Sequence, residues 1–103
     1  MNTPTLEVVT FKLNESVAED EFMQRARGLE SWLQQIDGFI KRELSKNEEG
    51  LWIDILHWRS LSEALSAAEQ IMAAPEGQAF GSLIDPESIN MMHVKSHYTF
   101  SSV

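Results

Sequence analysis

Cysteine is absent from the 103 residues of the chain. Its absence excludes disulfide bonds, thiolate nucleophiles and thiolate metal sites in one step. No apolar run approaches the roughly 18 residues of a membrane-spanning helix, and no cationic start leads into an apolar stretch like that of an export signal. We therefore expect a protein that has no membrane partner and works in the cytoplasm.

Cations are scarce. Eight Lys and Arg residues stand against 16 Asp and Glu residues, which gives a formal net charge of −8 at pH 7. The few cations are scattered from Lys12 to Lys95, whereas binding to a phosphate backbone needs clustered Lys and Arg that displace counterions. The charge balance therefore predicts no nucleic-acid partner.

The chain is long enough for one hydrophobic core and not for two, so residues 1–103 are expected to form a single domain. Runs of β-branched and apolar residues predict strands over residues 5–13, 38–46, 51–59 and 89–100. Capping boxes at Ser16 and Ser60, each followed by apolar residues at helical spacing, predict helices over residues 16–36 and 60–74. A short helical stretch is expected between Gly77 and Asp85. This βαββαβ order predicts an α+β, ferredoxin-like protomer with a four-stranded antiparallel sheet and both helices on one face.

The first and third predicted strands carry apolar side chains on both faces. In the third strand, one face holds Leu51, Ile53 and Ile55, and the other holds Trp52, Leu56 and Trp58. Two helices cover only one face of such a sheet, so the second face needs another partner. A second copy of the same sheet fits best, which predicts a homodimer through the sheet faces; the alternative is that residues 75–88 cover this face.

A short motif resembles a known family. Gly38-Phe39 opens the second strand, and Trp58-Arg59-Ser60 ends the third strand just before the Ala-rich helix that begins around Glu63-Ala64. This pattern is similar to that of the antibiotic biosynthesis monooxygenase-like family. The resemblance implies a dimeric α+β barrel built from ferredoxin-like protomers. Members of that superfamily include cofactor-independent oxygenases of aromatic polyketides and quinols, haem-degrading enzymes and proteins without an assigned activity.

The haem-degrading relatives carry a histidine ligand and a tryptophan in or just after the second helix. Residues 61–90 of this chain contain neither residue type. The sequence also lacks a glycine-rich phosphate loop, a nucleophile elbow and a dinucleotide fingerprint. We therefore expect no cofactor.

Asp54 is the most unusual residue of the chain, because a carboxylate stands in the middle of the apolar run LWIDIL. A four-residue loop over residues 47–50 would pair Lys46 with Leu51 and place Glu43 directly opposite Asp54. Two carboxylates at that distance would share a proton, which makes a general acid or base at neutral pH. The alternative is an ordinary ion pair of Asp54 with Lys41 or another cation.

Trp52 and Trp58 share the face of Asp54, six residues apart on one strand. Their backbones then lie about 20 Å apart, which is too far for both rings to sandwich one ligand. We assign Trp58 to the catalytic site as a wall of the pocket, beside its alternative role as a packing residue between strand and helix. Trp52 is assigned to ligand binding, or alternatively to a dimer contact.

His93 and His97 lie four residues apart in the last predicted strand. In a strand they share one face but lie about 13 Å apart, which is too far for both to bind one metal ion. We therefore predict no metal site and assign both histidines to ligand binding, as polar groups beside an apolar ligand. The same alternation predicts a buried opposite face, made of Met92, Val94, Ser96, Tyr98 and Phe100.

Two functions fit this sequence. The first is a cofactor-independent monooxygenase-like enzyme acting on an aromatic or other apolar small molecule, with Asp54 as the base that makes an anion able to react with dioxygen. The second is a non-catalytic dimer that binds a small apolar ligand or regulates another process with the same pocket.

Overall fold

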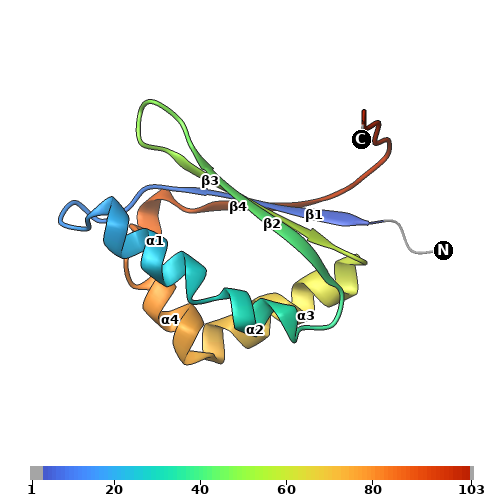
Figure 1. Ribbon diagram of the computed structural model, residues 1–103, viewed down its shortest axis with the longest axis horizontal. Coiled ribbons are helices and arrows are strands. Elements are labelled where there is room, and N and C mark those ends of the chain that lie inside the picture. Colours follow the sequence, from blue (N-terminus) through green and yellow to red (C-terminus); the bar gives the residue numbers. More distant parts are fainter. Residues whose placement is uncertain (1–3, 103) are drawn as a thin grey trace.

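A four-stranded antiparallel sheet forms one layer of the protein, and helices on one of its faces form the other (Figure 1). The computed structural model describes residues 4–102. The strands are β1 (Thr5–Phe11), β2 (Phe39–Lys46), β3 (Trp52–Trp58) and β4 (Asn90–Lys95), in the spatial order β2-β3-β1-β4. The helices are α1 (Glu19–Arg27), α2 (Glu30–Gln34), α3 (Leu61–Ala73), α4 (Pro75–Gly81) and a 3₁₀ turn, η1 (Pro86–Ser88). The predicted ferredoxin-like architecture is confirmed.

The first predicted helix is divided into α1 and α2. The break falls at Gly28, where the amide of Gly28 bonds to the carbonyl of Gln24 and that of Leu29 to the carbonyl of Ala26. Glycine has a low helix propensity, so a change of direction is cheap there. The capping box predicted at Ser16 is wrong, because α1 begins after Ala18 and has no side-chain cap. The predicted apolar stripe still reaches the core, which includes Phe22, Ala26, Leu29 and Leu33.

The second capping box is confirmed at the start of α3. The Ser60 hydroxyl accepts the backbone N–H of Glu63 and donates to the Glu63 carboxylate. The predicted apolar stripe of this helix is only partly correct, because the residues turned to the core are Ala64 and Ala67. Of its larger members, Leu61, Leu65 and Met72 are 44–76% exposed, whereas Ile71 packs against the core.

The β2–β3 hairpin has a different register from the predicted one. Lys46 pairs with Trp52 instead of Leu51, and Leu44 therefore faces Asp54. The loop closes with a turn in which Gly50 donates to the carbonyl of Asn47, and Gly50 takes the positive φ of 86° that favours glycine. A shift of one residue turns every β2 side chain to the other face, so the predicted pairing of Glu43 with Asp54 is wrong.

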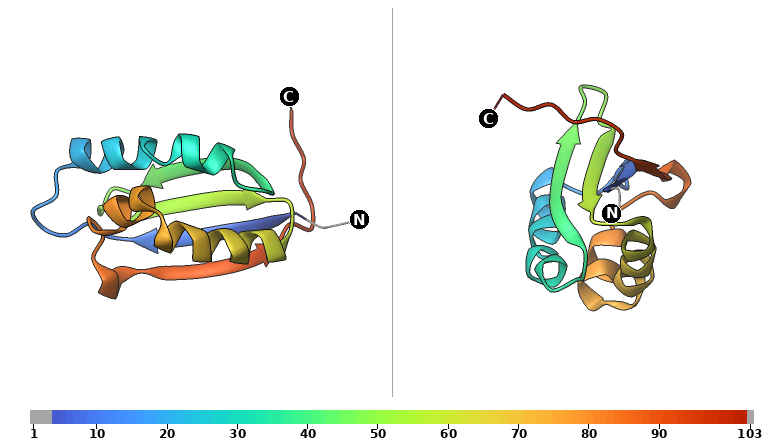
Figure 2. Two further views of the ribbon diagram at one scale, coloured as in Figure 1. Left: turned by 90° about the horizontal axis from the view of Figure 1, so that it is seen from below. Right: turned by 90° about the vertical axis from the view of Figure 1, so that its right-hand side faces the viewer.

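The last strand is shorter than predicted. Pairing between β1 and β4 ends at Thr5 and Lys95, and the next amide, that of Ser96, bonds to the carbonyl of Pro4. Residues 96–102 then leave the sheet as an extended arm (Figures 1 and 2). The predicted buried face of this strand is also wrong, because Met92 and Val94 are exposed and Tyr98 and Phe100 are more than 80% exposed.

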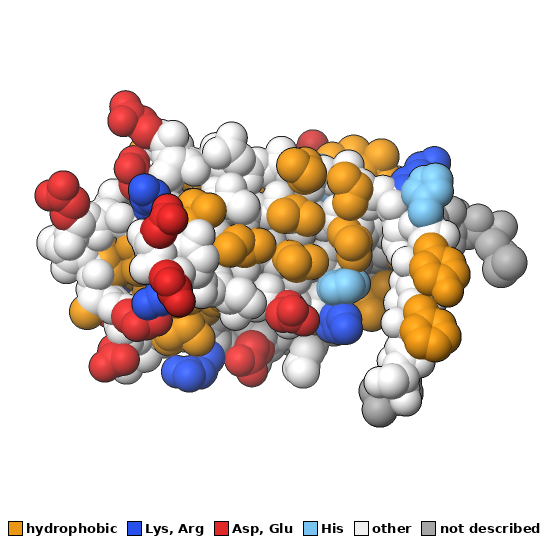
Figure 3. Space-filling model, turned by 90° about the horizontal axis from the view of Figure 1, so that it is seen from above, with side chains coloured by type: hydrophobic (Ala, Val, Ile, Leu, Met, Phe, Trp, Pro, Cys, Tyr) orange, Lys and Arg blue, Asp and Glu red, His pale blue; other side chains and the backbone are white. Residues whose placement is uncertain are grey.

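The sheet has two apolar faces, as predicted. The helices pack on the face that holds Phe11, Trp52 and Trp58, all at most 5% exposed. The other face, called here the open face, is viewed in Figure 3 and carries apolar side chains in its centre. These side chains come from three adjacent strands and are Leu6, Val8, Ile53, Ile55, Met92 and Val94. Helix α4 packs through Phe80 on the helix-covered face, so the alternative that residues 75–88 cover the open face is wrong.

None of the helices within residues 4–102 combines the length and the hydropathy of a membrane-spanning segment.

Candidate functional site

A cavity of about 220 Å³ lies between the helix-covered face of the sheet and the helices. Its wall is mostly apolar and includes Val9, Phe11, Leu29, Leu33, Leu56, Ile71, Phe80 and Ile84. Four exposed residues, Met72, Gly81, Ile89 and Met91, also line it and mark its rim between the helices and β4. Three charged side chains complete the wall: Glu7, Arg42 and Asp54. An apolar pocket with a few polar groups is the usual form of a small-molecule site.

Glu7 reaches the cavity from the middle of β1. The period of two in a strand places Glu7 on the same face as Thr5 and Phe11, and the residue is only 8% exposed. The indole nitrogen Nε1 of Trp58 donates to Glu7 Oε1 at 3.0 Å, and His93 Nε2 lies 3.7 Å from the same oxygen. No hydrogen bond to Oε2 is present among the described residues, and the Glu7 side chain lines the cavity.

Burial raises the pKa of the Glu7 carboxyl above its usual value of 4.5. The charge of His93 and the hydrogen bond from Trp58 act in the opposite direction, and the charge of Asp54 adds to the increase. The net shift is upward, because an ionised carboxylate is poorly solvated between the sheet and the helices. A carboxylate whose pKa is raised by burial is a better proton acceptor than a solvent-exposed glutamate.

Asp54 forms an ion pair with Arg42 across the β2–β3 hairpin. Arg42 Nε donates to Asp54 Oδ1 at 2.9 Å and Nη2 donates to Oδ2 at 2.6 Å, with side-chain exposures of 13% for Arg42 and 6% for Asp54. Arg42 Nη1 also donates to the carbonyl of Ala26, and the guanidinium lies 5.0 Å from the centre of the Phe80 ring. Of the two alternatives for Asp54, the ion pair is the one observed, and its partner is Arg42 instead of Lys41.

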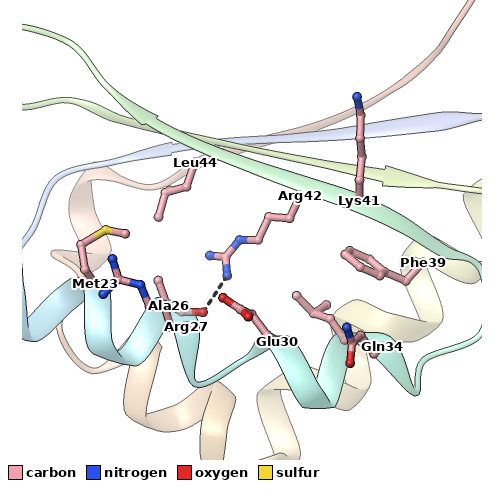
Figure 4. A pocket seen from close by; sticks show the side chains of 10 residues that line it. Met23, Ala26, Arg27, Glu30, Gln34, Phe39, Lys41, Arg42 and Leu44 are labelled. Carbon is pink, nitrogen blue, oxygen red and sulfur yellow. Dashed lines mark hydrogen bonds between the residues drawn. The ribbon is translucent and has the colours of Figure 1, made fainter.

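A second, more open hollow lies on the other side of Arg42, between α1–α2 and β2 (Figure 4). Its volume is about 340 Å³, and Arg27, Glu30 and Gln34 line it from the helices. Figure 4 shows Arg42 directed toward the helices, while Lys41 points to the opposite side of the sheet. Arg42 therefore separates this hollow from the apolar cavity.

The two tryptophans have different places in the core. Trp58 is 1% exposed, packs against Phe39 and holds Glu7 through its indole N–H. Trp52 belongs to another apolar cluster, where its ring lies 4.7 Å from that of Phe22. The structure thus brings Trp58 to the carboxyl of the candidate site, whereas Trp52 is a core residue away from the cavity wall.

The two histidines are also separated. His93 lies beside Glu7, and its Nε2 is buried with no hydrogen-bond partner among the described residues. His97 follows the end of β4 in the extended arm and is exposed. Within residues 4–102, no group of three or more potential metal ligands converges.

Sequence reasoning missed Glu7 and Arg42. Glu7 is a charged residue in phase with the buried side chains of β1, which is the same signal that singled out Asp54. Arg42 reaches the helix-covered face only in the observed hairpin register.

No protein-family model matches this sequence, and no curated protein is similar to it. Solved structures show the same fold. SnoaB from Streptomyces nogalater, a cofactor-independent oxygenase, has a TM-score of 0.70 and 16% identity, with 97% of each chain covered. A candidate antibiotic biosynthesis monooxygenase from Bordetella bronchiseptica has a TM-score of 0.78 and 12% identity, with 94% of this chain and 100% of that chain covered. Rv0793 from Mycobacterium tuberculosis has a TM-score of 0.70 and 12% identity, with 96% of this chain and 100% of that chain covered.

The protein is therefore an α+β protein with a ferredoxin-like fold. It has the fold of antibiotic biosynthesis monooxygenase-like proteins, as the resemblance of its Gly-Phe and Trp-x-Ser motifs implied. At these identities, the likeness establishes the fold alone.

Proposed function

We propose that the protein is a cofactor-independent oxygenase that acts on a small, neutral aromatic molecule in the cavity beside Glu7. The observation that carries this proposal is the buried Glu7 carboxyl, whose pKa is raised and which lines a mostly apolar cavity. The fold supports it, because SnoaB, a cofactor-independent oxygenase, has the same arrangement of elements. Glu7 replaces Asp54 as the proposed base, because Arg42 already binds both oxygens of Asp54.

The reaction begins with a proton transfer. Glu7 Oε2 takes the proton of a phenol-type hydroxyl, and the phenolate formed is electron-rich at the para carbon. Dioxygen, the co-substrate and oxidant, adds at that carbon, and the peroxide formed takes the proton back from Glu7. Loss of the remaining hydrogen of that carbon together with hydroxide then gives a quinone and one water molecule. One oxygen atom enters the product, and the other leaves as water.

The other polar residues of the site support this chemistry. The Trp58 indole N–H donates to Oε1, which leaves Oε2 as the proposed proton acceptor. Arg42, held by Asp54 and the Ala26 carbonyl, presents positive charge to the phenolate. His93 lies within 3.7 Å of Glu7 and is its polar neighbour on the β4 side.

Oxygen uptake with a panel of phenols, hydroquinones and anthrones tests this function. Enzyme-dependent consumption of dioxygen, with water and a quinone as products, supports the oxygenase. Thermal stabilisation by members of the panel without any turnover contradicts it and supports the alternative, a non-catalytic ligand-binding or regulatory protein.

We also propose that the protein forms a homodimer through the open face. The six apolar side chains in its centre are contributed by β1, β3 and β4, and a second copy of the same surface covers them with matching chemistry. The extended arm supports this interpretation, because it leaves the sheet on the side opposite to the helices (Figure 1).

Sedimentation equilibrium at micromolar concentration is expected to give twice the 11.7 kDa mass of one chain. Val8 lies at the centre of the open face, between Ile55 of β3 and Met92 of β4, so Val8→Lys is expected to give monomers. The matched control is Leu65→Lys on the exposed side of α3, which should remain dimeric. A wild-type chain that sediments at 11.7 kDa would refute the dimer.

A further inference from the structure

His93 stands directly opposite Glu7 in the pairing of β1 with β4. Directly paired side chains project from the same face of a sheet, so the imidazole and the carboxyl both lie on the helix-covered face. His93 Nε2 lies 3.7 Å from Glu7 Oε1, and the two side chains are 17% and 10% exposed. Because β4 is an edge strand, the imidazole lies between the buried carboxyl and the border of the sheet.

His93 Nε2 is the one buried side-chain nitrogen or oxygen that has no hydrogen-bond partner within residues 4–102. Native structures rarely leave such an atom unpaired, because folding has taken away its hydrogen bonds to water. His93 is not part of the cavity wall, so a ligand in the cavity does not supply the missing partner. Glu7 Oε1 is a carboxylate oxygen and therefore an acceptor for a proton on this nitrogen.

The contact needs only a small movement to become a hydrogen bond. N–H···O bonds span about 2.7–3.2 Å, so a shift of roughly 0.5–1 Å brings Nε2 to Oε1. A carboxylate oxygen has two lone pairs, and Oε1 can therefore accept from His93 while it accepts from Trp58 Nε1. The two donors come from β4 and β3, the two strands that flank β1, and together they fix the carboxyl from both sides.

Charge gives this contact a second effect. Burial is the largest influence on the pKa of Glu7 and raises it, and the charge of His93 is the largest influence that lowers this pKa. The charge of Asp54, which is paired with Arg42, adds to the increase in the pKa. Lys95, two positions further along β4, is the other charged residue on this face of the strand. A protonated His93 thus favours the ionised form of Glu7, which is the form that accepts a proton.

We propose that His93 is a positioning residue for Glu7, which donates its Nε2–H to Oε1 and, when protonated, keeps the carboxyl ionised. This inference rests on the proposal that Glu7 accepts the proton of the ligand. His93 acts through Glu7 and does not touch the ligand.

Wild-type protein and three variants are compared by carbon NMR titration of the Glu7 carboxyl. His93→Gln keeps a side chain that can donate a hydrogen bond but carries no charge, and His93→Leu removes both the donor and the charge. The matched control is His57→Gln, which makes the same substitution in β3 on the open face, opposite Leu6. Nitrogen NMR of the wild-type imidazole identifies the ring nitrogen that carries the proton, and the melting temperature of every variant is recorded.

We expect the neutral His93 ring to carry its proton on Nε2. The Glu7 midpoint should rise by about one pH unit in His93→Leu, because the favourable charge and the hydrogen bond are both lost. The rise should be smaller in His93→Gln, and the midpoint should stay unchanged in His57→Gln.

A Glu7 midpoint that is equal in wild type and in both His93 variants would overturn the proposal, even if their melting temperatures fall, because His93 would then be a structural residue only. A neutral ring with its proton on Nδ1 would also overturn it, because Nε2 could not donate. If His93→Leu does not fold, His93→Gln decides, because its side chain is close in size to that of histidine.

The pH profile of dioxygen consumption, with 1-naphthol as the phenol, provides a second readout. The acid limb of kcat/KM reports the ionisation of the free enzyme, so in His93→Leu this limb should move to higher pH by the same amount as the Glu7 midpoint. The rate at low pH should fall about tenfold, which corresponds to one pH unit, and should return when the pH is raised. A structural defect would lower the rate at every pH.

The outcomes separate this inference from the proposed function. If the Glu7 midpoint moves as expected but no dioxygen is consumed, His93 positions a carboxyl of a binding protein and only the oxygenase is refuted. If dioxygen is consumed with the same pH profile by wild type and both His93 variants, the oxygenase stands and the role of His93 is refuted.

Discussion

Replacement of Glu7 by glutamine is expected to lower the rate of dioxygen consumption at least 100-fold. General bases typically contribute 10²–10⁴-fold to a rate, and an amide cannot accept the proton of a phenol. The amide has the same shape, and its oxygen still accepts the Trp58 indole N–H that Oε1 accepts now. The loss is therefore one of chemistry and not of structure, and ligand binding should change much less than the rate.

Three comparisons make this result specific to the carboxyl. Glu7→Asp keeps the acid but withdraws it from the cavity, so we expect a rate between those of the wild type and Glu7→Gln. Trp58→Phe removes the N–H that fixes Oε1, and the rate should fall about tenfold. Glu43→Gln alters an exposed carboxyl on the other side of the sheet and should have no effect. A Glu7→Gln variant with full activity would eliminate Glu7 as the base.

The same substitution is expected to change the pH dependence of stability. Because the pKa of Glu7 is raised on folding, the folded protein holds this proton more tightly than the unfolded chain. The contribution of Glu7 to stability is then most favourable below pH 4.5 and is lost as the pH rises above that value. Urea unfolding between pH 4 and pH 8 should therefore show Glu7→Gln gaining stability relative to wild type as the pH rises.

Removal of Asp54 is expected to have the largest effect on stability. The Asp54–Arg42 pair is almost fully buried, and loss of one partner leaves the other charge without compensation. Breaking a buried pair in this way costs about 3–5 kcal/mol. Urea unfolding of Asp54→Ala should show a loss of this size, accompanied by a clear fall in the melting temperature.

A double variant separates the charge from the packing. Arg42→Met with Asp54→Leu replaces the pair by apolar side chains of similar size and should recover most of the lost stability. Glu19→Ala is the exposed control, since Glu19 is 54% exposed and its partner Lys46 is 38% exposed, and its effect should be much smaller. An Asp54→Ala protein as stable as wild type would show that the ion pair between Arg42 and Asp54 does not stabilise the fold.

The architecture of this protein could be predicted because its signals are local. Strand-like runs, the Ser60 capping box and the stop before Pro75 each depend on a few neighbouring residues, and all are observed. The two apolar faces of β1 and β3 followed from the period of two in a strand. The break at Gly28 was not predicted, because a glycine can lie within a continuous helix or at the end of one. Tertiary packing decides between the two, and the local sequence does not show it.

The partner of Asp54 depended on a single residue of the hairpin loop. The loop length sets the register, and the register decides whether Glu43 or Arg42 shares a face with Asp54. Both readings were compatible with the sequence NEEG between the strands. Loop geometry, with Asn47 bound to Leu51 and Gly50 at positive φ, resolved the choice in favour of Arg42.

The candidate site is harder to predict because its contacts are distant in sequence. Trp58 donates a hydrogen bond to Glu7, which is 51 positions away in the sequence. His93 lies beside Glu7 on β4, the edge strand that flanks β1 on the side away from β3. The arm that carries His97 was predicted as strand because its residues have high β propensity. Pairing ends where β1 begins, however, and propensity alone does not extend a sheet.

The most direct test of the central claim is a carbon NMR titration of the Glu7 carboxyl, assigned by comparison with Glu7→Gln. We predict a midpoint above 4.5, the usual value for glutamate, and a further change of this midpoint when 1-naphthol fills the cavity. A midpoint at or below 4.5 that does not respond to 1-naphthol would contradict the assignment of Glu7 as the proton acceptor of a ligand site.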